Sequence, residues 1–301
     1  MTRSKHRKGV LLMIGATLCW STAGMLVRKL SLTDGWEITF WRSLFMTVFV
    51  LGVLLLQYGR ATFTKIRAVG WLGITVGALW TLMYVSFILA LGRTTVANVL
   101  VLSSISPFVA ALMGGLFLHE KVPGRTLLAM LAAFAGVVLM FVESIGSGGL
   151  VGNLIALAIP LGFACNVVLL RKMHASVDMI PTLVISGVIS MAVTLPLALP
   201  IDARTTDLGL LAIMGVVQLA IGLLLMLAAT PRLKAAEIGL LSVTETIFGT
   251  FLTWLVIGEQ PGELALTGGL IVIAALVINE AVGLREKSVS PSAERAAQTG
   301  H

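Results

Sequence analysis

The chain has 301 residues, of which 57% are hydrophobic and 12% are charged, and its mean hydropathy is +1.01. Soluble domains carry about 25% charged residues, so this composition excludes an ordinary soluble domain and makes lipid the expected solvent. The formal net charge of +7 is spread over short segments between apolar runs. That distribution is typical of loop charges that set membrane topology, and it argues against nucleic-acid binding.

The N-terminal segment 1–8 is basic, and an apolar run of about 20 residues follows it. No small-residue cleavage site ends this run, so we interpret it as a first membrane-spanning helix rather than a removed signal peptide. Nine further runs are long enough to cross about 30 Å of hydrocarbon at 1.5 Å per residue. The ten predicted spans are 9–28, 36–58, 68–91, 94–118, 124–142, 150–170, 180–200, 208–230, 235–257 and 263–283.

The last segment, 284–301, is polar and is predicted to be a disordered cytoplasmic tail. With the N-terminus in the cytoplasm, 16 lysines and arginines fall on the inner side and four on the outer side. This bias follows the positive-inside rule, and it predicts that both termini are cytoplasmic.

The chain contains an internal repeat, marked by Glu120 and Glu259, which lie 139 residues apart at the ends of two apolar runs. An ungapped overlay of residues 93–140 on 232–279 gives ten identical positions out of 48. The repeat predicts two five-helix units, 9–142 and 150–283. Because five is odd, the second unit is expected to enter the membrane inverted, as in many transporters. The two glutamates would then lie on opposite faces, where we expect each to fix the short turn that follows it.

Several segments carry a family resemblance: Trp41-Arg42-Ser43 early in the second run, and the run ends 116–120 and 255–259, each followed by a glycine-containing helix. Together they resemble the drug/metabolite transporter superfamily in its ten-helix EamA-type branch, and within it the bacterial exporters of aromatic amino acids. The resemblance implies an all-α integral membrane protein in the bacterial inner membrane. It also implies a carrier that moves amino acids outward by alternating access.

Polar groups in hydrocarbon are costly, so those near the middle of a span are candidates for a central binding cavity. The aromatic and polar candidates for substrate binding are Trp20, Trp80, Tyr84, Asn98, Ser103, Phe163, Asn166, Gln218, Ser242 and Glu245. Glu245 is the one acidic residue expected close to the midplane. It is interpreted either as a site for a substrate ammonium group or a coupling proton, or as a packing group bonded to a neighbouring helix.

Arg42 is predicted to lie about 9 Å into the second span. It could bind a substrate carboxylate, but the depth and the resemblance favour an anchor near the outer face that pairs with backbone or with Glu37. Pro107 is expected to bend its span and free the carbonyl near Ser103. Gly239 and Gly249 are expected to loosen the equivalent span of the second unit, so these two spans are the predicted moving elements.

The leading hypothesis is a secondary transporter that exports neutral amino acids, including aromatic ones, and related small metabolites. The alternative is a proton-coupled drug or metabolite antiporter, or an importer. The chain shows no Walker loop, nucleophile constellation, CxxC pair or His/Cys cluster, so no catalytic residue, metal or cofactor is expected and an enzyme is disfavoured. A channel is disfavoured because the spans lack a repeated polar stripe. The expected partners are the amino acid substrate and the lipid bilayer, with a monomer favoured over a dimer.

Overall fold

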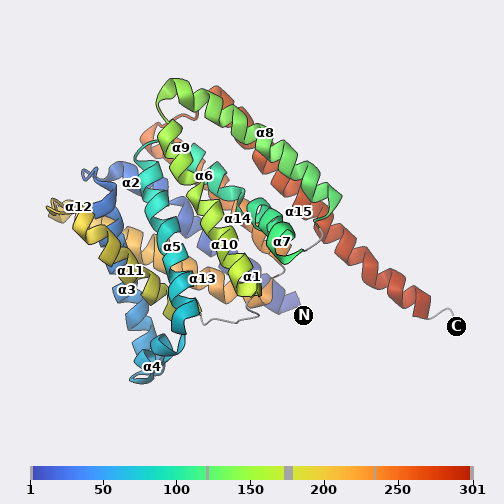
Figure 1. Cartoon of the computed structure of the whole chain (residues 1–301), viewed down its shortest axis with the longest axis horizontal. Helices are drawn as coiled ribbons and strands as arrows, with labels where there is room; N and C mark the ends of the chain where they lie inside the picture. The colour runs from blue at the N-terminus through green and yellow to red at the C-terminus, as the bar shows by residue number, and fades with distance from the viewer. Residues whose placement is uncertain (1–2, 120–121, 173–178, 234, 299–301) are drawn as a thin grey trace.

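The protein is built from helices, and the computed structural model describes residues 3–119, 122–172, 179–233 and 235–298 (Figure 1). No strand occurs in those ranges. In chain order the elements are α1 (Arg3–Ser21), α2 (Ala23–Lys29), α3 (Gly35–Tyr58), α4 (Ala61–Ala68), α5 (Gly70–Leu91), α6 (Val96–Ser104), α7 (Ser106–Leu118), α8 (Gly124–Ser147), α9 (Leu150–Ala156), α10 (Ala158–Lys172), α11 (Met179–Thr194), η1 (Leu195–Leu197), α12 (Thr205–Ile213), η2 (Met214–Ile221), α13 (Gly222–Ala229), η3 (Thr230–Arg232), α14 (Ala235–Ile257) and α15 (Glu263–Gln298).

Eight helical segments are long and apolar enough to cross a membrane. They are α1 with α2, α3, α5, α6 with α7, α8, α9 with α10, α11 with η1, and the run from α12 to η3. Two further apolar helices are shorter, Leu241–Ile257 and Glu263–Asn279, and they lie within α14 and α15. The all-helical membrane fold is therefore confirmed. The count of ten spans and the cytoplasmic placement of both termini stay predictions.

The fourth predicted span is broken into α6 and α7 at Ile105. Pro107 follows this break and has no N–H to donate to the Ser103 carbonyl one turn earlier. The hydroxyl of Ser106 donates to that carbonyl instead, at 2.5 Å. The structure thus has a helix break next to Pro107, and a neighbouring serine donates to the carbonyl that the proline leaves without its backbone donor.

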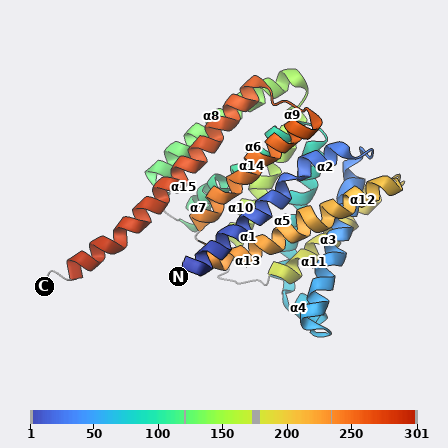
Figure 2. The same ribbon diagram turned by 180° about the vertical axis from the view of Figure 1, so that it is seen from behind.

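Helices α8 and α15 lie side by side in both views of the molecule (Figures 1 and 2). They approach closely through Gly136 and Gly268, since a Cβ atom added to Gly268 would meet the carbonyl oxygen of Gly136. Near one end, Thr126 donates to the Asn279 side chain at 2.9 Å. Near the other end, Glu143 accepts from the first turn of α15, at the amide of Ala265. This pairing follows from glycines that let two backbones touch in lipid.

Helices α3, α5 and α11 form a second close group. Gly187 of α11 packs against Thr47 of α3, and a hydroxyl–hydroxyl bond of 2.8 Å joins Ser43 to Ser190. Thr81 of α5 donates to a carbonyl of α11 at 2.8 Å. Small and hydroxyl-bearing residues thus replace bulky apolar ones at this contact, as expected for helices that associate within a bilayer.

The C-terminal helix differs from the prediction for segment 284–301. The structure continues α15 as a helix to Gln298, and the C-terminal part of this helix projects away from the bundle (Figures 1 and 2). The segment contains good helix formers, among them Glu286, Lys287 and Ala293. Adding residues to an existing helix requires no new nucleation, so a polar sequence with good propensity can extend it. Residues 299–301 lie outside the described part of the chain.

Candidate functional site

Arg42 is the charged centre of the interior. Its side chain is 3% exposed, and its Nε atom donates to Oε1 of Gln218 at 3.1 Å. Its Nη1 atom is fully buried and has no hydrogen-bond partner. The guanidinium also lies 5.7 Å from the ring centre of Phe87. A buried cation therefore presents one free nitrogen to the interior of the bundle.

The predicted pairing of Arg42 with Glu37 was wrong. Glu37 instead accepts hydrogen bonds from the backbone amides of Asp202 and Ala203, at 2.8 to 3.1 Å, and from the indole of Trp41. Arg42 lies five positions after Glu37, which turns their side chains about 140° apart on a helix with 3.6 residues per turn. Glu37 thus faces a loop while Arg42 faces the helices of the second half.

Gln218 reaches Arg42 from a π-helical stretch, η2, which interrupts the helical run between α12 and α13. Such stretches are rare and occur frequently at functional sites, because the wider turn redirects side chains. Two glycines, one near the start of this stretch and one just after it, allow close contacts with neighbouring helices. A Cβ on Gly215 would meet the backbone of Arg42, and a Cβ on Gly222 would meet the indole nitrogen of Trp20.

Helix α5 adds two aromatic side chains whose polar atoms have no partner. The rings of Trp80 and Tyr84 lie 5.8 Å apart, and Trp80 Nε1 and Tyr84 Oη are buried without hydrogen bonds. Tyr84 packs in one core cluster with Met46, which lies one turn after Arg42 on α3. The two rings therefore form an apolar wall with polar tips next to the guanidinium.

Asn166 on α10 is likewise buried, and neither atom of its side-chain amide has a partner. It lies one helical turn beyond Gly162, whose Cβ position meets Met83 and Leu79 of α5. This contact places the α10 face that carries Asn166 against α5.

Glu245 on α14 completes the group. It is partly exposed, and no nitrogen–oxygen distance of 4.0 Å or less joins it to Arg42 in the described part of the chain. The two residues are still close enough for their charges to interact. The backbone carbonyl of Glu245 accepts a long bond of 3.4 Å from Ser21 of α1. A carboxylate and a guanidinium thus lie in the bundle without forming an ion pair with each other.

The structure brings Arg42, Trp80, Tyr84 and Gln218 together from α3, α5 and η2. Asn166 and Glu245 lie on α10 and α14, two further helices of the bundle. Buried polar atoms in proteins are nearly always hydrogen-bonded, so a group of unpartnered ones indicates a place for a polar ligand or water. All of these except Arg42 are among the binding residues predicted from the sequence, and a binding role for them stays a prediction. Arg42 was assigned chiefly to an anchoring role, although the topology count left it as the one basic residue within a span.

The remaining predicted binding residues lie elsewhere or satisfy their own helices. Ser103 and Ser242 donate to carbonyls one turn earlier, at 2.7 and 2.8 Å. Asn98 donates to Thr94 at 3.1 Å, near the start of α6 and away from the central group. Trp20 packs against α13 at Gly222, beside the group. Phe163 is half-buried on α10.

Two of the predicted hinge residues are described. Pro107 follows a real helix break, whereas α14 continues as a helix through Gly249. A Cβ on Gly249 would meet Leu100 of α6, so this glycine permits a close helix contact. The side-chain surroundings of Gly239 lie outside the described part of the chain. A role in motion stays a prediction for all three.

An ion pair closes the end of the bundle where α2 and α14 end. Arg28 Nε lies 2.6 Å from Glu259, and the other oxygen of Glu259 accepts from the amide of Val96 at 2.7 Å. Arg28 also donates to the carbonyls of Leu91 and Thr94, at 2.8 Å each. Glu259 therefore caps α6 and joins the two halves of the chain, rather than fixing the turn that follows α14. Glu120 lies outside the described residues.

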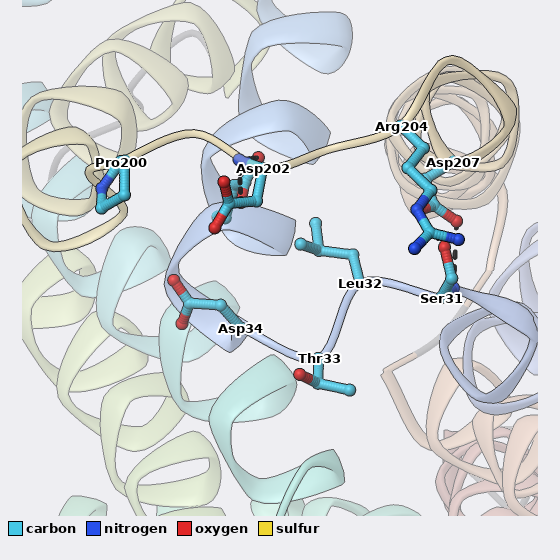
Figure 3. A pocket seen from close by; sticks show the side chains of 9 residues that line it. Ser31, Leu32, Thr33, Asp34, Pro200, Asp202, Arg204 and Asp207 are labelled. Atoms are coloured by element: carbon cyan, nitrogen blue, oxygen red, sulfur yellow. Dashed lines mark hydrogen bonds between the residues drawn. The ribbon is translucent and has the colours of Figure 1, made fainter.

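A cleft of about 270 Å³ opens between two loops at the start of α3 and of α12. Figure 3 shows Ser31 and Asp207 joined across the gap, with Arg204 beside them. The Asp207 carboxylate accepts from the backbone and the hydroxyl of Ser31, at 3.0 and 2.5 Å, and Asp34 caps α3. These carboxylates already accept hydrogen bonds from the protein, so we interpret them as groups that hold the two loops together rather than as a ligand site. Among the described residues, no group of three or more His, Cys, Asp or Glu side chains could hold a metal ion.

Comparison with known proteins agrees with this arrangement. Residues 7–142 and 150–280 each match the EamA-like transporter family. The chain is 25% identical over 275 residues to the pseudopaline exporter CntI of two Pseudomonas aeruginosa strains, across 90% of this chain and 95% of that one. A solved crystal structure, 15% identical, superposes with a TM-score of 0.62 and covers 94% of this chain and 97% of that chain. The last match supports the fold alone.

Proposed function

The chain belongs to the EamA-like transporter family, and we propose that it exports neutral amino acids, aromatic ones included, and related small metabolites. As a family member with an exporter among its relatives, it is a multi-pass inner-membrane transporter and not an enzyme. The amino acid substrate is our own step beyond that assignment.

The observation that carries the proposal is the unpaired acid and base in the interior. Arg42 has a free buried nitrogen, and Glu245 faces it without forming an ion pair. A zwitterion supplies one charge of each sign, so it satisfies both groups at once and leaves no net charge behind. The neighbouring Trp80 and Tyr84 rings offer an apolar surface for a side chain.

The two family matches, 7–142 and 150–280, support transport by two related units. We propose that these units have inverted topology, with ten spans and both termini in the cytoplasm. An inverted pair has two near-equivalent packings, one open to each side of the membrane. Exchange between them would expose the central group to each side in turn.

A second candidate is a proton-coupled antiporter for drugs or metabolites, favoured by the carboxylate of Glu245. Among the described residues no hydrogen bond joins this carboxylate to another side chain, and an acidic group within a membrane span is a candidate for carrying a coupling proton. Both candidates use the same cavity, and they differ in whether export responds to a pH gradient.

Purified protein in liposomes tests both. The vesicles are loaded separately with phenylalanine, tryptophan, threonine and methionine, and efflux is followed with and without a pH gradient. We expect efflux at least tenfold above empty liposomes for the two aromatic substrates, and a loss of most of it in Glu245→Gln. The exposed Glu263 at the start of α15 provides the matched control, as Glu263→Gln. Efflux equal to that of protein-free vesicles for all four amino acids would reject the proposal, and a wild-type rate insensitive to the pH gradient would reject coupling.

A further inference from the structure

The free side of the Arg42 guanidinium is the most specific chemical feature of the central group. A desolvated cation costs several kcal/mol when nothing neutralises it nearby. Here Gln218 occupies only Nε, and Nη1 has no partner. We infer that Arg42 binds the carboxylate of the substrate, so that the transporter selects molecules with a free carboxylate over amines and amides of the same shape. This inference rests on the proposed function and names the substrate class for that site.

The geometry favours arginine for this task. A guanidinium offers a planar fork of donors that matches the two oxygens of a carboxylate, and it stays charged when buried. Three neighbours limit the orientation of that fork in this protein. Gln218 binds it at one edge, the Phe87 ring lies 5.7 Å away, and the Gly215 contact fixes the backbone. The preorganised fork therefore keeps Nη1 buried and without a partner, and little ordering is left for the ligand to supply.

Gln218 is a positioning residue in this scheme. It acts on the substrate through Arg42, and the π-helical stretch η2 gives it the reach to do so. Its amide oxygen is neutral, so it orients the cation without neutralising it. A carboxylate at the same place would pair with Arg42 and compete with the substrate.

The other groups near Arg42 support this choice. Glu245 on α14 is an acidic side chain within the bundle, and Tyr84 is a neutral one on α5. Glu245 forms no ion pair with it, so the cation is balanced at a distance and its donors remain available. A bound amino acid would place its carboxylate at Arg42 and its ammonium group toward Glu245.

The test compares binding of phenylalanine and of phenylalaninamide to the purified protein in detergent, by calorimetry. A charge-assisted hydrogen bond is worth about 1.5–3 kcal/mol, so the wild type is expected to prefer the acid about 10- to 150-fold. Arg42→Gln should reduce this preference to about twofold or less while the Kd for the amide changes little. Arg60→Gln, which removes an exposed cation after α3, is the control and should keep the full preference.

Two further variants separate recognition from folding. Gln218→Glu keeps the size and the acceptor, and it should weaken acid binding at least tenfold without weakening amide binding. Arg42→Lys keeps the charge but not the planar fork of donors, so it should retain a reduced preference for the acid over the amide. This variant provides the test if Arg42→Gln does not fold. Equal weakening of acid and amide binding in these variants, or an unchanged preference, would overturn the inference. If the wild type binds neither compound, the proposed function fails and this inference fails with it.

Discussion

The ion pair between Arg28 and Glu259 provides the most direct test of how the bundle opens. Its charges join the ends of α2 and α14, and Glu259 also holds the first amide of α6 through Val96. We predict that these helix ends must separate when the cavity opens toward the face that carries them, which the positive-inside rule assigns to the outside. Glu259→Gln removes the charge and keeps the shape.

The magnitude follows from burial. Exposed ion pairs contribute about 0–1 kcal/mol, whereas breaking a buried one costs about 3–5 kcal/mol. The side chains of Arg28 and Glu259 are 27% and 19% exposed, between these limits. Glutamine keeps an acceptor for Val96, so the expected loss is about 1–2 kcal/mol, which moves the equilibrium toward the outward-open state about 5- to 30-fold.

The assay uses a buried reporter. Leu100 is 3% exposed and contacts α14 at Gly249, one turn beyond Val96. In a background with Cys19→Ser and Cys165→Ser, a Leu100→Cys variant is labelled in whole cells with a membrane-impermeant maleimide. Adding Glu259→Gln should speed labelling about 5- to 30-fold, in line with the population shift.

Glu263→Gln, on the same face but exposed, should leave the labelling rate unchanged. A labelling rate in Glu259→Gln within twofold of the parent would refute the reasoning, since it would mean that the ion pair does not oppose opening.

Two predictions concern the α8–α15 pair. Gly268→Ala should destabilise the protein by about 1–3 kcal/mol, because its Cβ would meet the carbonyl oxygen of Gly136. Gly209→Ala is the control and should leave the stability unchanged, because there is open space around Gly209. Thermal unfolding in detergent measures both variants, and equal melting temperatures would contradict the contact. Thr126→Val should lower the stability of the protein by about 1–3 kcal/mol, because it leaves the buried side-chain oxygen of Asn279 without a donor. An unchanged melting temperature would show that water replaces the threonine hydroxyl.

Eight of the spans were predictable from the sequence because hydropathy is a property of each residue and its neighbours along the chain. The break at Ile105 was predictable for the same reason, since Pro107 acts within its own helix. The hydrogen-bond partners of a side chain on other helices were not predictable from the sequence. The depth of Arg42 was estimated from its distance along α3, but its rotation about the helix axis decides that it meets Gln218 and not Glu37.

The π-helical stretch that carries Gln218 was not predictable either, because residues 214–221 form an ordinary apolar run around one glutamine. Asn98 illustrates the same limit from the other side. It was predicted to line the central cavity, but Thr94 and Asn153 form a separate polar group with it near the start of α6. Composition identifies which polar residues need partners, and only packing decides which of them share a cavity.

The central group is asymmetric, and this bears on how an inverted repeat handles a zwitterion. The overlay aligns Glu245 with Ser106, whose hydroxyl is bonded within its own helix. Arg42 lies on α3, and α11, the second helix of the other half, contains no charged residue within Met179–Thr194. The first half thus supplies the positive charge of Arg42 and the second half the negative charge of Glu245, and neither residue has a charged equivalent in the other half. A substrate held between Arg42 and Glu245 would bridge the two units, so each exchange of packings must carry it at the interface between them rather than pass it from one unit to the other.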